Sequence, residues 1–94
     1  MSDKGRLYVV ATPIGNLKDF TFRAIETLKE VDFVFAEDTR NSIQLMKHYS
    51  IETKIDSYHE HNSVKKTPKV INLLNEGNNI ALISDAGTLS LINI

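Results

Sequence analysis

The fold of this 94-residue chain is decided by Leu7-Tyr8-Val9-Val10-Ala11-Thr12-Pro13-Ile14-Gly15-Asn16-Leu17-Lys18-Asp19. A short apolar run enters a turn with proline and glycine, and the amphipathic segment 20–31 follows. This order is typical of the first strand, turn and helix of an open α/β sheet. Pro13 stiffens the turn, and Gly15 lets the backbone approach a ligand closely because it has no Cβ. A plain strand-to-helix turn is the alternative, since turns favour the same residues.

The rest of the chain repeats this alternation of apolar runs and helical periods. Strands are predicted over residues 6–11, 33–36, 54–58 and 80–83, the first covered on both faces and the third nearer an edge. Between them, three helical segments are expected, which gives the order βαβαβαβ. The connections are long enough for right-handed crossovers, so we expect an α/β fold with a parallel sheet and helices on both faces.

The ends of the expected helices carry capping residues. Asp19 or Thr21 is suited to cap the first helix, and several polar residues from Asp38 onward are suited to cap the second. The inward face of the second helix is expected to contain Ile43 and Met46, with Leu45 flanking it. The third helix is expected to begin with Thr67-Pro68, as N-cap and first helical residue, and to end at Gly77.

Composition excludes several classes of protein. A net charge of −1 gives no strong overall attraction for nucleic acid, and the absence of cysteine excludes a disulfide framework and cysteine-based zinc sites. The polar residues 1–6 and the short apolar run behind them do not fit a signal peptide, and no window approaches the ~20 apolar residues of a membrane span. One domain in the cytoplasm is expected.

Polar residues gather where the predicted strands end. Parallel strands share one carboxyl edge, so the segments 12–19, 37–40, 59–62 and 84–88 are expected to lie together and form a ligand site. Asp85-Ala86-Gly87-Thr88 suits a close backbone approach to a polar small molecule, and a strand-to-loop turn with Asp85 as a local cap is the alternative. For Glu37 the sequence favours a plain acid at a helix start, whereas Asp38 and Arg40 are open between that role and ligand binding.

His59 and His61 raise the question of a metal, because two imidazoles two residues apart share one face of a strand. The sequence offers no third ligand at a clear spacing, so we expect no metal site. A histidine that contacts substrate or acts as a general base is the favoured interpretation, and a solvated loop is the alternative. Lys65, Lys66 and Lys69 form a small basic patch beside this loop, suited to RNA phosphates or simply to solvent.

Four strings in register carry a resemblance to a known family. They are residues 7–19, Ala36-Glu37-Asp38-Thr39-Arg40, His59-Glu60-His61-Asn62 and Ala81-Leu82-Ile83-Ser84-Asp85-Ala86-Gly87-Thr88. In order and spacing they resemble the ribosomal RNA small subunit methyltransferase I group of the tetrapyrrole methylase superfamily. The resemblance implies an S-adenosyl-L-methionine-dependent homodimer with two α/β domains and the donor in the cleft between them. It also implies 2′-O-methylation of a cytidine in small-subunit (30S) ribosomal RNA, with no metal.

The resemblance also assigns roles to residues of this chain. It implies cofactor binding for Pro13, Gly15, Asp85, Ala86, Gly87 and Thr88. Substrate binding is implied for Asn16, His61 and Asn62, and catalysis for Asp38, Arg40 and His59. Two departures bear on activity: Leu89 stands where the family has proline, and the Asp-Pro-Gly string expected next is replaced by Leu91-Ile92-Asn93-Ile94.

We therefore expect residues 1–94 to be a truncated N-terminal domain of such an enzyme, without the second domain and with little activity alone. Methylation of a tetrapyrrole precursor carbon is the alternative within the superfamily. A non-catalytic α/β module that dimerises or binds a ligand is the alternative outside it.

Overall fold

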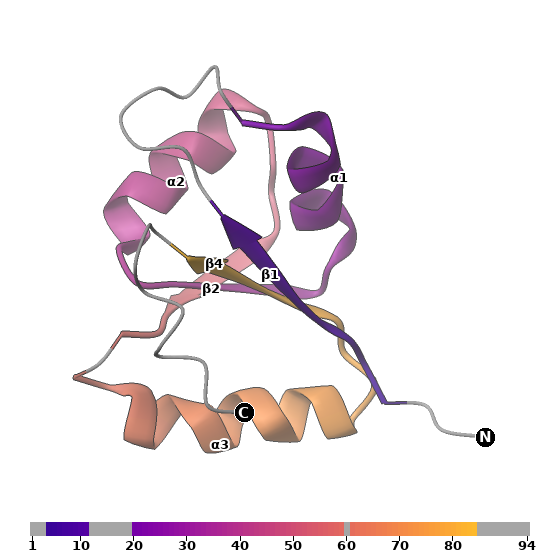
Figure 1. Ribbon diagram of the computed structural model, residues 1–94, viewed down its shortest axis with the longest axis vertical. Helices are drawn as coiled ribbons and strands as arrows, with labels where there is room; N and C mark the ends of the chain where they lie inside the picture. Colours follow the sequence, from indigo (N-terminus) through magenta and orange to yellow (C-terminus); the bar gives the residue numbers. More distant parts are fainter. Residues whose placement is uncertain (1–3, 12–19, 60, 85–94) are drawn as a thin grey trace.

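The protein is an α/β domain with a parallel four-stranded sheet, as the sequence predicts (Figure 1). The computed structural model describes residues 4–11, 20–59 and 61–84. The elements run β1 (Leu7–Ala11), α1 (Phe22–Glu30), β2 (Phe33–Ala36), α2 (Thr39–His48), β3 (Lys54–Ser57), α3 (Ser63–Asn75) and β4 (Ile80–Ser84). Strand order is β1-β4-β2-β3, and every pair is parallel.

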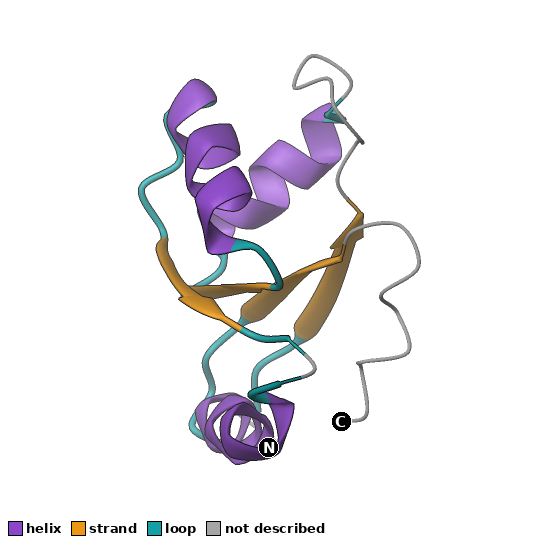
Figure 2. Ribbon diagram, turned by 90° about the vertical axis from the view of Figure 1, so that its left-hand side faces the viewer, coloured by secondary structure: helices purple, strands orange, loops and turns teal. Residues whose placement is uncertain are grey.

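Helices cover both faces of the sheet. Helices α1 and α2 lie on one face and α3 lies on the other (Figure 2). Alternate residues of β2 serve the two faces: Val34 packs in the cluster under α1 and α2, and Phe35 packs in the cluster above α3. Leu28 of α1 is fully buried in the first cluster, and burying a leucine of this kind stabilises a fold by about 1.5–3 kcal/mol.

Two helix ends follow local rules, and one predicted inward position is corrected. Thr21 caps α1 by accepting from the Ala24 N–H at 3.1 Å. Gly77 ends α3 at a φ of 93°, as predicted from its lack of a Cβ. The predicted inward position of Ile43 was wrong, because Ile43 is 37% exposed whereas Leu45 is buried at 3%.

The predicted start of α3 at Thr67 was also wrong, by about one turn. The helix begins at Ser63, and Pro68 lies inside it. The carbonyl of Asn62 accepts from the N–H groups of Lys65 and Lys66 at 3.0 and 2.9 Å, and these bonds start the helix before the proline is reached. At 13 residues α3 is the longest described helix, and none in the described part of the chain is long and apolar enough to cross a membrane.

The two edges of the sheet differ from each other. Strand β3 is an edge strand, as predicted. Strand β1 forms the other edge of the described sheet and leaves Val9 46% exposed and Tyr8 37% exposed. Successive side chains of a strand point to opposite faces, so the prediction that residues 6–11 are covered on both faces was wrong for this strand. An apolar run does not reveal how much of each face the helices cover.

Candidate functional site

The candidate site is the carboxyl edge of the sheet, where all the described strands end on the same side. Two of the polar loops predicted to meet there are described, at residues 37–38 between β2 and α2 and at residues 58, 59, 61 and 62 between β3 and α3. The predicted residues Pro13, Gly15, Asn16, Asp85, Ala86, Gly87 and Thr88 lie outside the described residues.

The two described loops lead to helices on opposite faces of the sheet. Strand β2 is followed by α2 on one face, and its neighbour β3 is followed by α3 on the opposite face (Figures 1 and 2). In open α/β sheets ligands bind outside the carboxyl ends of the strands. We call the described residues of these two loops, 37–40, 57–59, 61 and 62, the β2/β3 edge.

Asp38 and Arg40 lie together at the start of α2. Asp38 is the N-cap: its Oδ1 accepts from the N–H groups of Arg40 and Asn41 at 3.0 and 3.4 Å, and its Oδ2 accepts from the Asn41 side chain at 3.1 Å. Both carboxylate oxygens of Asp38 therefore bind groups within the helix. Arg40 is exposed beside it, with its side chain at the surface.

Glu37 stands out among the described residues of this edge. Its Oε2 atom is buried and has no hydrogen-bond partner in the described part of the chain. Sequence reasoning favoured Asp38 over Glu37 as a site residue, although both follow the apolar strand directly. One signal in the sequence points to Glu37. A single acid is enough to cap the helix, so the other of two adjacent acids is available for a different role.

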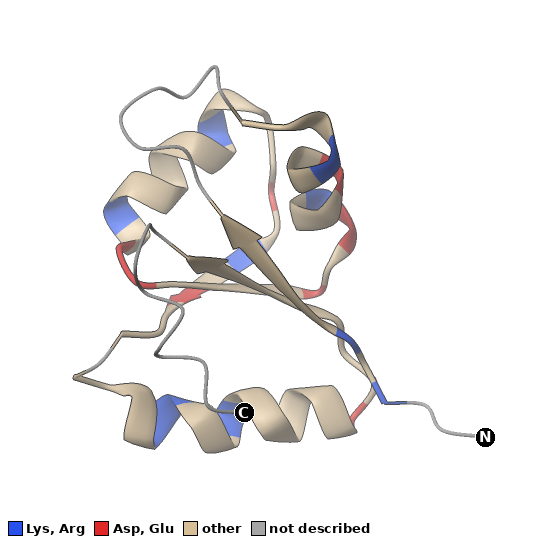
Figure 3. Ribbon diagram, in the orientation of Figure 1, with Lys and Arg blue, Asp and Glu red and all other residues tan. Residues whose placement is uncertain are grey.

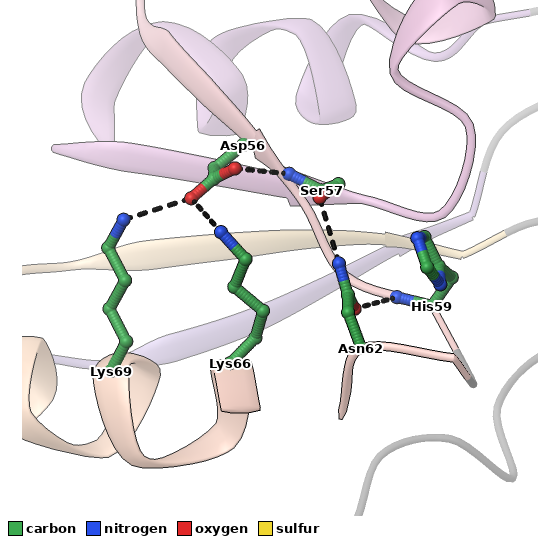
Figure 4. A network of polar contacts seen from close by, with 6 residues as sticks. All are labelled: Asp56, Ser57, His59, Asn62, Lys66 and Lys69. Carbon is green, nitrogen blue, oxygen red and sulfur yellow. Dashed lines mark hydrogen bonds and ion pairs between the residues drawn. The ribbon is translucent and has the colours of Figure 1, made fainter. Parts of the chain in front are cut away.

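The loop after β3 is held by a chain of polar contacts, shown in Figure 4. The Asn62 Oδ1 atom accepts from the His59 N–H at 2.8 Å, and the Asn62 Nδ2 atom donates to the Ser57 Oγ atom at 2.9 Å. The Asn62 side chain thus joins the end of β3 to the loop, and it makes no capping bond to α3 although Asn62 is the N-cap residue. The amide of Asn62 already has two internal partners. Substrate binding by Asn62 stays a prediction.

The rings of His59 and His61 lie in an edge-to-face arrangement in this loop, with their centroids 5.8 Å apart. The His61 backbone N–H donates to the Nδ1 atom of His59 at 3.2 Å. Because a backbone N–H can only donate, Nδ1 bears no hydrogen, and a neutral ring then carries it on Nε2. In this geometry His59 is equipped to donate a hydrogen bond to a ligand through Nε2, and no group of three candidate metal ligands exists among the described residues.

Asp56 ties the edge strand β3 to helix α3. Its Oδ2 atom accepts from the ammonium groups of Lys66 at 2.8 Å and Lys69 at 2.9 Å, and its Oδ1 accepts from the Ser57 N–H at 2.7 Å (Figure 4). The hydrogen bond from Lys66 is the main reason that the pKa of Asp56 lies well below its ordinary value, with partial burial opposing it and Lys69 and Ser57 adding to it. The Tyr58 and Thr67 hydroxyls, 2.7 Å apart, add a second tie between the same elements.

A surface hollow of about 260 Å³ lies elsewhere, between β1, α1 and the residue that precedes β4. Tyr8, Arg23, Glu26, Thr27, Glu30, Val31 and Asn79 line it. Because Val31 follows α1 and Asn79 precedes β4, the hollow lies toward the amino ends of the strands. It contains none of the predicted site residues, and we assign it no role.

The fold is that of a parallel α/β protein with polar loops at the carboxyl edge of its sheet. A family model, Tetrapyrrole (Corrin/Porphyrin) Methylases, matches residues 6–92, so the chain belongs to this family. The chain is 60% identical over 87 residues to Ribosomal RNA small subunit methyltransferase I of Streptococcus pyogenes serotype M6. It is 59% identical over 86 residues to the protein of the same name from Bacillus subtilis.

Each of these matches covers most of this chain and a minority of the relative. The first covers 93% of this chain and 30% of the Streptococcus protein, and the second covers 92% and 30%. The protein of the same name from Synechocystis is 55% identical over 84 residues, with 89% and 30% covered. The chain thus spans about 30% of the length of the relatives that it matches.

Proposed function

We propose that this chain is the N-terminal α/β domain of a methyltransferase that modifies small-subunit ribosomal RNA. The observation that carries the proposal is the 60% identity, over 93% of the chain, to a relative named for that activity. The polar β2/β3 edge supports it, because parallel sheets bind small ligands at the carboxyl ends of their strands. A tetrapyrrole substrate is less well supported, since the similar proteins cited above are named as ribosomal RNA enzymes.

The finer proposal is transfer of a methyl group from S-adenosyl-L-methionine to the ribose 2′-oxygen of a cytidine. The bound donor would supply a methyl group already activated on a sulfonium. The protein's task is then to align the acceptor hydroxyl and help remove its proton. Pro13, Gly15 and residues 85–88 are the proposed donor-binding residues. Asp38, Arg40, His59, His61 and Asn62 remain the proposed residues on the substrate side, together with Asn16.

The charge distribution is compatible with an RNA partner on the side of α3. The sequence of α3, SVKKTPKVINLLN, has three lysines and no acid (Figure 3). Asp56 offsets part of this charge, and Lys65 and Lys69 remain exposed. Exposed lysines beside a substrate site are suited to contact phosphates, which position an RNA without reading its sequence. A homodimeric assembly in the cytoplasm completes the proposal.

The test is mass mapping of small-subunit ribosomal RNA from the source organism, with the gene intact and deleted. Loss of a ribose methyl group from one cytidine in the deletion strain is the expected result, and restoration by the intact gene is the control. An unchanged methylation map would overturn the ribosomal RNA proposal. A changed corrinoid or porphyrin profile with an unchanged map would favour the tetrapyrrole alternative.

A further inference from the structure

Glu37 carries a buried carboxylate oxygen whose presence the fold alone does not explain. The Oε2 atom has no hydrogen-bond partner among the described residues. Burying an acceptor without a donor is costly, and more so for a charged group than for a neutral one. Native proteins satisfy nearly all such atoms, so an exception requires an explanation such as a ligand.

The position of Glu37 places this residue at the carboxyl edge of the sheet. Ala36 pairs with Ser57 of β3 on one side and with Ile83 of β4 on the other. Glu37 therefore emerges between Tyr58 and Ser84, the residues that follow those partners, and both are buried. The carboxylate lies at the carboxyl end of a central strand, where the connections to α2 and α3 diverge.

Three other polar side chains of the β2/β3 edge already have partners within the fold. Asp38 uses both oxygens at the start of α2, and Asn62 uses its amide between Ser57 and His59. Nδ1 of His59 accepts from the backbone of the same loop. The buried Oε2 atom of Glu37, by contrast, has no partner among the described residues, so it can accept from a donor that comes from outside.

We propose that Glu37 accepts a hydrogen bond from a ribose hydroxyl of a nucleoside bound at the β2/β3 edge. A carboxylate is an acceptor only, so its partner must be a donor. An acid at a strand end that binds ribose hydroxyls is the recurring solution in nucleotide-binding α/β sheets. The inference rests on the proposed function, in which both the methyl donor and the RNA acceptor present a ribose. It adds a residue that sequence reasoning had assigned to a plain helix start.

The test is an NMR titration of the 94-residue chain with three probes, because NMR detects weak binding. The probes are S-adenosylhomocysteine, a short single-stranded RNA that contains cytidine, and DNA of the same sequence. Glu37→Gln is the test variant, since it keeps the shape of the side chain and removes its charge. Glu52→Gln, at an exposed acid in the loop before β3, is the matched control.

The expected result is roughly tenfold to hundredfold weaker binding by Glu37→Gln, the loss for a hydrogen bond to a charged group. A loss confined to S-adenosylhomocysteine assigns the ribose to the methyl donor. A loss for RNA that abolishes the preference for RNA over DNA assigns it to the acceptor. Wild-type binding of every probe by Glu37→Gln would overturn the inference and leave the proposed function intact. Failure of the unmodified chain to bind any probe would overturn the proposed function for this chain, and the inference with it.

Stability without ligand gives an independent readout. Glu37→Gln should leave the urea midpoint of the free chain unchanged or raised, because no internal hydrogen bond is lost. Asp38→Ala, which removes a cap with three hydrogen bonds, should lower the midpoint. A fall for Glu37→Gln as large as that for Asp38→Ala would show that the carboxylate has a partner within the fold, and would overturn the inference.

Discussion

Asp56→Asn is the most informative single change for the stability of the fold. The carboxylate of Asp56 joins the edge strand β3 to helix α3 through Lys66 and Lys69. The asparagine variant keeps an oxygen for the Ser57 N–H and loses both ion pairs, leaving two ammonium groups side by side. The change therefore isolates the charge interaction from the local turn geometry.

The magnitude follows from the exposure of the three side chains. Asp56 is 34% exposed, Lys66 is 26% exposed and Lys69 is 53% exposed. Solvent screens such pairs, so each contributes about 0.3–1 kcal/mol, with Lys66 toward the upper value. We expect Asp56→Asn to lower the free energy of unfolding by about 1–1.5 kcal/mol, or by roughly 4–10 °C in melting temperature for a domain of this size.

Urea unfolding followed by circular dichroism, at low salt and at about 1 M salt, measures this difference. The gap between wild type and Asp56→Asn should shrink at high salt because the Debye length falls to about 3 Å. Glu52→Gln is the control, because an exposed acid should change stability by less than about 0.5 kcal/mol. Equal stability of the wild type and Asp56→Asn at low salt would refute the reasoning.

The same pair of proteins gives a test in pH. The pKa of Asp56 is depressed in the folded state below its ordinary value of 3.8, so its contribution is present above that pH and is lost as the pH falls toward the folded pKa. Between about pH 5 and pH 2 the wild type should therefore lose its advantage over Asp56→Asn. A difference that stays constant over this range would mean that the carboxylate does not carry the effect.

Three further changes test packing and the site loop. Gly5→Ala should lower stability by about 2 kcal/mol or more, because a Cβ at Gly5 would overlap the backbone carbonyl of the loop before β4, and its melting temperature checks this. Leu28→Ala should cost about 2.5–4 kcal/mol in urea unfolding, against less than about 0.5 kcal/mol for Val64→Ala, since Leu28 is fully buried and Val64 is 87% exposed. Asn62→Ala should speed hydrogen exchange of the His59 amide, which loses its acceptor, and an unchanged exchange rate would contradict the contact.

The β2/β3 edge shows where sequence reasoning about the site stops. The sequence located both of its described loops, because polar residues after a buried run mark the end of a strand. It favoured Asp38 over Glu37 as a site residue, although both are acids beside the same helix and the pattern does not reveal which of them caps it. The structure separates them, because capping geometry engages the oxygens of Asp38 and leaves one buried oxygen of Glu37 without a partner.

The sequence by itself determined the parallel α/β class, the order of strands and helices, the end of α3 at Gly77 and the family. These follow from periodicity, local capping and short strings, all of which act over a few neighbouring residues. Tertiary structure decided the strand order β1-β4-β2-β3 and the exposed edge at β1. It also decided which acid pairs with which lysine. These features depend on contacts between residues far apart in the chain, whose energies local patterns do not contain.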